Sequence, residues 1–225
     1  MKKLKKEYYF IAVLLVLFGI LTMFVIKGNM DMIDEIAFNN VIKIKNTFIT
    51  EFLRVITHLA STTGIIILLF ITAGIFIKKK SFSDFKYVIG NVGIGVILMK
   101  VIKHIIKRVR PSWKWIVQGG FSYPSGHTIS ALLFYGTLML LVNKKVKGKA
   151  KKPLLIFFLV MIILTPISRV YFGAHYLSDV VASILLGSII LIISNIFMNK
   201  EFNNDKDKNR KTIQTKWYCN LRTNI

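Results

Sequence analysis

The hydrophobic positions of the chain gather into long runs that contain almost no charged residues and are separated by short polar segments. A helix of about 20 residues, rising about 1.5 Å per residue, crosses the hydrocarbon core of a bilayer. The pattern therefore predicts an all-α, polytopic membrane protein with six transmembrane helices. The expected spans are residues 8–26, 55–77, 87–106, 130–142, 154–166 and 180–198, of which the fourth can start as early as Gly126 and the fifth extends toward Tyr171.

The first run follows four lysines, as the apolar stretch of a cleaved signal peptide would. It is longer than the roughly 7–15 residues of such a stretch, and no Ala-x-Ala cleavage site follows it. We therefore expect residues 8–26 to remain as a transmembrane helix.

The segment from Asp31 to Phe52 mixes apolar residues with charges, which predicts one or two amphipathic helices at the membrane surface. The spacing of Asp31, Asp34 and Glu35 does not favour a metal site. We expect a single domain over residues 1–200, followed by a mobile, basic and polar cytoplasmic tail over residues 201–225.

Composition agrees with a membrane protein and excludes two other classes. Of 225 residues, 54% are hydrophobic, which excludes a disordered chain. Lys and Arg number 32 against 10 Asp and Glu, giving a net charge of +22. Such an excess can indicate nucleic-acid binding on a soluble domain, but here the basic residues flank apolar spans. The lone cysteine, Cys219, cannot form an internal disulfide.

The basic residues also predict the orientation. Four Lys/Arg-rich regions share one side in a six-span arrangement: the N-terminus, residues 78–86, residues 143–153 and the tail. Because cytoplasmic loops are enriched in Lys and Arg, we expect a multi-pass protein of the cell membrane with both termini in the cytoplasm. One loop on the opposite side is also basic, with Lys103, Lys107, Arg108, Arg110 and Lys114, and we interpret it as an anion-binding cluster.

Three short motifs lie near the extracytoplasmic ends of the expected spans. They are Lys103-x6-Arg110-Pro111, Pro124-Ser125-Gly126-His127 and Ser168-Arg169-x5-His175-x3-Asp179. The arginine fork donates two hydrogen bonds to a phosphate. A glycine at a helix N-terminus lets backbone N–H groups approach an oxyanion. The motifs therefore predict a site for a tetrahedral oxyanion.

Two histidines and a carboxylate add reactive chemistry to this site. His175 and Asp179 are four residues apart, so on a helix they share a face. Asp179 can then hold one ring nitrogen of His175 and leave the other directed at the ligand. His127 is a second imidazole that can protonate a leaving oxygen.

Together, the three motifs resemble the signature of the type 2 phosphatidic acid phosphatase (PAP2) superfamily, with every fixed position filled between Lys103 and Asp179. The resemblance implies that His175 is the nucleophile of a phosphohistidine, that Asp179 orients it and that His127 protonates the leaving group. It implies catalysis without a metal or other cofactor. It also implies a set of residues that hold the phosphoryl oxygens, namely Lys103, Arg110, Ser125, Gly126 and Arg169.

Three functions follow from these observations. The first is a membrane phosphatase that hydrolyses a lipid phosphate or diphosphate at the outer face, with undecaprenyl diphosphate, phosphatidylglycerophosphate and phosphatidic acid as candidate substrates. The second is a phosphotransferase that passes the phosphoryl group to another acceptor. The third, an anion transporter, has no need of a nucleophile with an orienting carboxylate and an acid. We expect membrane lipids as the surroundings, no nucleic acid and no obligate protein partner.

Overall fold

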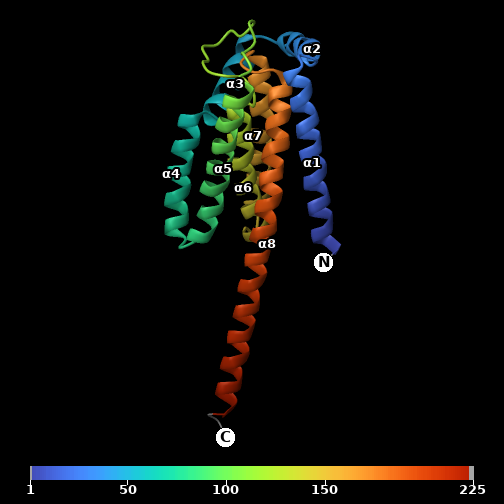
Figure 1. Ribbon diagram of the computed structural model, residues 1–225. Helices are drawn as coiled ribbons and strands as arrows, with labels where there is room; N and C mark the ends of the chain where they lie inside the picture. Colours follow the sequence, from blue (N-terminus) through green and yellow to red (C-terminus); the bar gives the residue numbers. More distant parts are fainter. Residues whose placement is uncertain (1, 223–225) are drawn as a thin grey trace.

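The computed structural model describes residues 2–222, and within them the side chains of residues 6–203. All regular structure in this range is α-helical, which confirms the predicted fold class (Figure 1). The helices are α1 (Lys2–Ile26), α2 (Asp31–Ile42), α3 (Thr47–Leu59), α4 (Thr62–Lys78), α5 (Phe82–Ile106), α6 (Gly126–Lys145), α7 (Lys151–Tyr171) and α8 (Leu177–Arg222).

Five helices, α1, α5, α6, α7 and α8, are long and apolar enough to cross a membrane as single segments. The sixth crossing is broken, because α3 and α4 meet at an angle of 57°. The prediction of a continuous span over residues 55–77 is therefore wrong. Ser61 ends the run by capping α4, accepting from the Gly64 N–H, while its hydroxyl donates to the His58 carbonyl. A Cβ at Gly64 would lie 2.1 Å from that carbonyl oxygen, so the tight junction requires glycine.

Helix α6 lies at the centre of the bundle and packs against α4, α5, α7 and α8. Its upper half is buried all round, with side chains such as Ile129, Leu133 and Phe134 in the main apolar core. Lower in the bundle, the Asn91 amide of α5 donates to Thr137 of α6 and to Ser194 of α8, at 2.8 and 2.9 Å. This central helix gives the motif at its N-terminus, Pro124 to His127, a rigid support.

The predicted amphipathic segment is divided between two helices. Helix α2 lies across one end of the bundle, as an interfacial helix would (Figure 1). It exposes Met32, Ile33 and Ile36 and buries Asp34. The other part of the segment forms the start of α3, whose first turn is capped by the Asn46 side chain, which accepts from Ile49 N–H at 2.8 Å.

Helix α8 is much longer than the span expected within it, since it continues without interruption to Arg222. No helix end marks the boundary that we expected at residue 201. The side chains beyond residue 203, and with them the basic side chains of the tail, lie outside the described part of the molecule.

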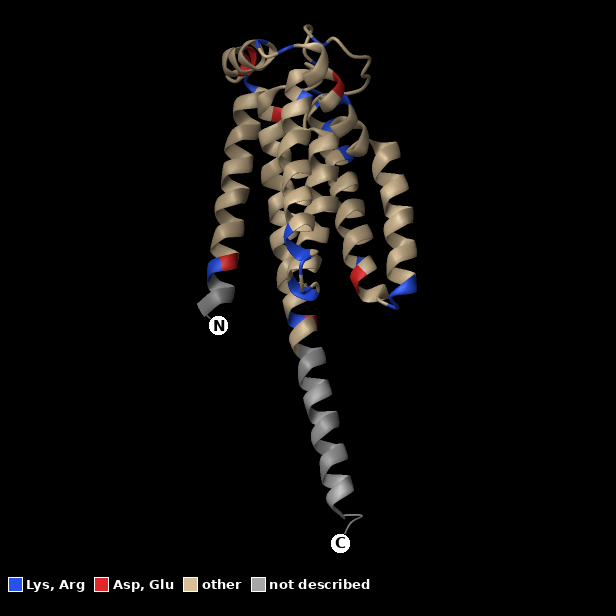
Figure 2. Cartoon of the chain, turned by 180° about the vertical axis from the view of Figure 1, so that it is seen from behind, with Lys and Arg blue, Asp and Glu red and all other residues tan. Residues whose placement is uncertain are grey.

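The two termini lie at the same end of the bundle, while α2 and the segment 107–125 lie at the other end (Figure 1). Figure 2 shows Lys and Arg gathered near the ends of the helices on the side of the termini. The membrane-crossing segments therefore alternate in direction along the chain, as the predicted orientation requires.

Candidate functional site

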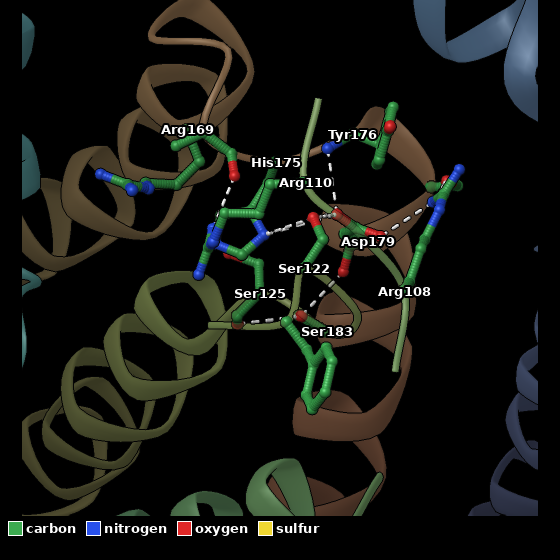
Figure 3. Close-up of polar contacts among 12 residues, drawn as sticks. Arg108, Arg110, Ser122, Ser125, Arg169, His175, Tyr176, Asp179 and Ser183 are labelled. Carbon is green, nitrogen blue, oxygen red and sulfur yellow. Dashed lines mark hydrogen bonds and ion pairs between the residues drawn. The ribbon is translucent and has the colours of Figure 1, made fainter. Parts of the chain in front are cut away.

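The three motifs meet at the end of the bundle that carries α2. The Lys103 motif leads from the end of α5 into the segment 107–125, the second motif starts α6, and the third joins α7 to α8. Ser125 connects two of them, because its N–H donates to the Asp179 carbonyl at 3.3 Å and its carbonyl accepts from the Ser183 hydroxyl at 3.0 Å (Figure 3). Residues more than 50 positions apart are thus held together by backbone contacts.

A cavity of about 340 Å³ lies among these motifs. Five of the expected site residues line it, and so does Gln118, which sequence reasoning missed. The five are Lys103, Arg110, Gly126, His127 and His175. The rest of its wall is mainly apolar and comes from α4 and α5, including Ile65, Ile66, Leu69, Val92, Val96 and Met99. The cavity therefore joins a cationic, imidazole-bearing end to a hydrocarbon-like wall.

His175 is buried, with 2% of its surface exposed, and its two ring nitrogens have different neighbours. Nδ1 lies 3.4 Å from Oδ2 of Asp179, and Nε2 lies 3.1 Å from Nη1 of Arg110 (Figure 3). Asp179 can only accept at Nδ1, so the pair favours the tautomer with a proton on Nδ1 and a lone pair on Nε2. This is the arrangement of an oriented nucleophile beside a cation.

Burial is the main influence on the His175 imidazole and lowers its pKa from 6.5 to about 3. The Asp179 carboxylate opposes this effect, while the charges of Arg169 and Arg110 add to it. His175 is therefore neutral at ordinary pH, as a nucleophile must be.

The carboxylate of Asp179 is completely buried and is held from several sides. Its Oδ2 accepts from the Ser122 hydroxyl and, at 3.0 Å, from the Tyr176 N–H. Its Oδ1 accepts from Nη1 of Arg108 at 2.9 Å (Figure 3). These donors leave the carboxylate little freedom to rotate away from His175.

Arg108 was expected in the anion-binding cluster, but its guanidinium contacts carboxylates of the protein, Asp179 among them. Its Nη2 lies 2.8 Å from Oδ2 of Asp34 on α2, and its guanidinium lies over the Tyr176 ring, 3.8 Å from the centroid. Burial lowers the pKa of Arg108, but Asp179 and Asp34 outweigh burial and raise it. No local pattern links residues 34, 108 and 179, so only the fold could reveal this contact.

The two cations of the first motif lie in the cavity wall with their donors on backbone carbonyls. Lys103 Nζ donates to the carbonyls of Phe121 and Ser122, at 2.5 and 3.1 Å. Arg110 donates through Nη1 to Ala174 O at 2.6 Å and through Nε to Gly119 O at 3.0 Å. These contacts direct both side chains along residues 107–125, the segment that covers the cavity and forms its roof.

Arg169 is buried behind this surface, with 1% of its area exposed. Its Nη1 donates to Thr57 Oγ1 at 2.7 Å and its Nη2 to Gln118 Oε1 at 2.8 Å. Among the described side chains its Nε has no hydrogen-bond partner. Leaving a buried donor unpaired is costly, and an anion entering beside Gln118 would relieve that cost.

Ser125 has a different position from the one expected of a phosphate-binding hydroxyl. It is completely buried and caps α6, accepting from the Thr128 hydroxyl at 2.9 Å. Gly126, which follows, does line the cavity, and a Cβ there would meet only the end of Met99, at 3.4 Å. The open space over Gly126 is thus part of the cavity, while Ser125 supports it from below.

Comparisons with known proteins agree with this site. The family model of the PAP2 superfamily matches residues 85–203. Phosphatidylglycerophosphatase B of Bacillus subtilis (strain 168) is 30% identical over 171 residues, which cover 74% of this chain and 84% of that protein. An undecaprenyl-diphosphatase of Sulfolobus acidocaldarius is 27% identical over 208 residues, covering 85% and 91% of the two chains.

A solved structure has the same architecture. The crystal structure of a transmembrane PAP2 type phosphatidylglycerolphosphate phosphatase from Bacillus subtilis has a TM-score of 0.78 and 30% sequence identity. The match covers 85% of this chain and 97% of that one. Family model, relative and architecture agree on the part of the chain that carries all three motifs, and the chain therefore belongs to the PAP2 superfamily, as a membrane phosphatase of that type.

Proposed function

We propose that this protein hydrolyses the phosphate or diphosphate group of a membrane lipid at the outer face of the cell membrane, through a phosphohistidine on His175. The observation that carries the proposal is the composition of the cavity, in which His175, His127 and three cationic side chains, Lys100, Lys103 and Arg110, line the same space as an apolar wall from α4 and α5. A lipid headgroup needs the polar end and its chain needs the apolar wall.

The proposed reaction has two displacements. Nε2 of His175 attacks phosphorus and forms a P–N bond while the bond to the leaving oxygen breaks, and His127 gives that oxygen a proton. A water molecule then attacks the phosphohistidine, the P–N bond breaks, and His127 takes a proton from the water. The products are the dephosphorylated lipid and inorganic phosphate, and each proton is accounted for.

The charge that develops on the phosphoryl oxygens meets fixed donors. Arg110 already lies 3.1 Å from the attacking nitrogen, so a phosphoryl group bound there contacts its guanidinium. Lys103 and the N-terminus of α6 at Gly126 line the same cavity. Such preorganised donors stabilise a transition state because they need no rearrangement when the charge appears. Arg169 is buried behind these donors, and its Nε, which has no hydrogen-bond partner among the described side chains, is a further donor for the phosphoryl group.

The names of the relatives suggest which lipids to test. We propose phosphatidylglycerophosphate and undecaprenyl diphosphate first, and phosphatidic acid as a third. Among the three, an outward-facing site favours undecaprenyl diphosphate, because this lipid carrier is released as the diphosphate on the outer face of the membrane.

The test is phosphate release by the purified protein in detergent with EDTA present, on each of these three lipids. We expect turnover in EDTA and a loss of at least about 10³-fold in His175→Ala. His104→Ala is the matched control, since His104 is exposed on α5, where its ring contacts the Lys100 carbonyl at 2.7 Å and the edge of the Phe121 ring. This control should keep wild-type activity.

Two results would contradict the proposal. Activity that survives in His175→Ala would exclude a phosphohistidine intermediate. Activity that is abolished by EDTA and restored by a metal ion would exclude catalysis without a metal. A folded protein that releases no phosphate from any of the lipids, but passes it to an added alcohol, would be the phosphotransferase.

A further inference from the structure

We propose that Arg108 and Asp34 are positioning residues for catalysis, through which the interfacial helix α2 holds the carboxylate of Asp179 against His175. The proposal rests on the function proposed above for His175 and Asp179. It assigns a role in the reaction to two residues that are not fixed positions of the three motifs and do not line the cavity.

Arg108 is fixed at both of its terminal nitrogens. Nη1 donates to Asp179 Oδ1 at 2.9 Å and to the Ser178 hydroxyl at 2.7 Å, and Nη2 donates to Asp34 Oδ2 at 2.8 Å. The Tyr176 ring covers the flat face of the guanidinium, at 3.8 Å. A planar fork with a carboxylate on each side can adopt one orientation only.

Asp34 is fixed just as firmly. Its side chain is fully buried although it belongs to a helix that lies across the end of the bundle. Its Oδ1 accepts from the Ser178 N–H at 2.8 Å, at the start of α8, and its Oδ2 accepts from the Ser178 hydroxyl at 2.7 Å. A buried carboxylate needs such partners to offset its lost hydration. Asp34 therefore joins α2 to the first turn of the helix that carries Asp179.

The contact between Asp179 and His175 depends on the other donors to the carboxylate. At 3.4 Å, the distance from Oδ2 to Nδ1 is long for a hydrogen bond, so these donors must keep Oδ2 facing Nδ1. Arg108 holds the opposite oxygen of the same carboxylate. Without Asp34, Nη2 of the guanidinium keeps only the exposed Asp31, whose Oδ1 lies 3.4 Å away, and the hold of Arg108 on the Asp179 carboxylate is weakened.

The primary test is Asp34→Asn, which keeps the shape and the acceptor for Ser178 N–H but removes the charge facing Arg108. Residues that orient a reacting group typically contribute about 10- to 100-fold. We expect kcat to fall about 10-fold in Asp34→Asn and about 100-fold in Arg108→Gln, with KM within about threefold of wild type in both. The double variant should lose no more than Arg108→Gln alone, because the two residues act as a unit.

A matched control is available at the far end of the bundle. Asp84 is also a buried carboxylate held by a cation, with Lys145 Nζ at 2.7 Å, and it is remote from the cavity. Asp84→Asn should leave kcat and KM unchanged. If Asp34→Asn and Asp84→Asn lose activity to the same extent, the protein needs its buried ion pairs in general, and the proposal is overturned.

A second readout does not depend on substrate. ¹⁵N NMR of histidine-labelled protein in detergent reports the tautomer of His175, identified by its absence in His175→Gln. We expect the Nδ1-protonated tautomer in wild type and a mixture of tautomers in Asp34→Asn and Arg108→Gln. An unchanged tautomer in both variants, whatever their activity, would overturn the positioning role. Inactivity of the wild type with this tautomer response intact would count against the proposed function only.

Discussion

At the scale of single residues, the site depends on an imidazole and a carboxylate that are both removed from water. His175 is 2% exposed and Asp179 is completely buried. Burial favours the neutral imidazole. In the proposed reaction, the carboxylate beside it would stabilise the positive charge that develops on the ring when Nε2 attacks phosphorus.

The protonation of His175 can be measured. Burial lowers its pKa from 6.5 to about 3, so between these values the folded protein keeps the neutral ring while an unfolded chain would bind a proton. The nucleophile is therefore available throughout this range, and this group makes folding less favourable as the pH falls through it. We expect the ¹⁵N signals of His175 to stay those of a neutral ring from pH 7 to about pH 5.

The substitution His175→Gln identifies the His175 signal among those of the four histidines in the same spectrum. A His175 resonance that titrates near pH 6.5 in the ligand-free protein would show that the ring is hydrated, and would contradict its burial.

At the scale of elements, helices α4 and α5 supply the apolar wall of the cavity. Helix α4 packs against α3, α5 and α6, and the break at Ser61 sets its direction relative to α3. Ile66 of α4 lines the cavity although 48% of its surface is exposed, whereas its neighbour Ile67, 54% exposed, does not line it. This pair of adjacent residues separates the cavity wall from the outer surface of the same helix.

We expect Ile66→Trp to raise KM for a long-chain lipid phosphate by about 10-fold, because the indole occupies room that the chain needs, at a typical cost of about 1–3 kcal/mol. A short-chain phosphate should be hydrolysed as by the wild type. Phosphate-release kinetics on both substrates make the comparison, and Ile67→Trp is the control. Equal effects of the two substitutions would show that the lipid chain lies elsewhere.

The segment 107–125 is the roof of the site and is packed onto the start of the third motif's loop. Gly173 has a φ of +63° and a Cβ there would lie 3.0 Å from Lys114 Cα. The indole of Trp115 donates to the Tyr171 carbonyl at 2.9 Å and packs against the Phe172 ring. The close approach that Gly173 permits holds the roof against the loop that carries His175, where Arg110 Nη1 lies 3.1 Å from Nε2 of the ring.

At the scale of the whole molecule, the site and the two termini lie at opposite ends of the bundle (Figure 1). Lys and Arg lie at both ends of the bundle, and several are gathered at the helix ends on the side of the termini (Figure 2). Since Lys and Arg favour the cytoplasmic side, we expect the site to face outward. Such an orientation would restrict the substrate to lipids of the outer leaflet.

Cysteine labelling tests this orientation in intact cells, in a background with Cys219→Ser. Val117 is fully exposed in the roof segment, and Lys79 is exposed in the turn between α4 and α5. We expect a membrane-impermeant maleimide to label Val117→Cys directly, and Lys79→Cys only after the cells are permeabilised. The reverse pattern would place the site in the cytoplasm.

The sequence by itself determined those features that depend on interactions between residues close together along the chain. Apolar run length determined five of the spans, because a bilayer imposes its thickness on each segment separately. The spacing of the motifs predicted which side chains gather, and five of them do line one cavity. The pairing of His175 with Asp179 was likewise foreseen, since the two are only four residues apart.

Only the tertiary structure decided the rest, because those features depend on packing between distant segments. The break at Ser61 arises where α3 and α4 meet at 57°, and the polar stretch there, residues 61–64, was included in one long run because the residues on both sides are apolar. Arg108 and Asp34 are 74 positions apart, and the sequence placed one in an anion-binding cluster and the other in an amphipathic surface segment, with no sign that they meet. The sequence also did not reveal that Ser125 caps α6, because the direction of a side chain is set by the backbone of the assembled bundle.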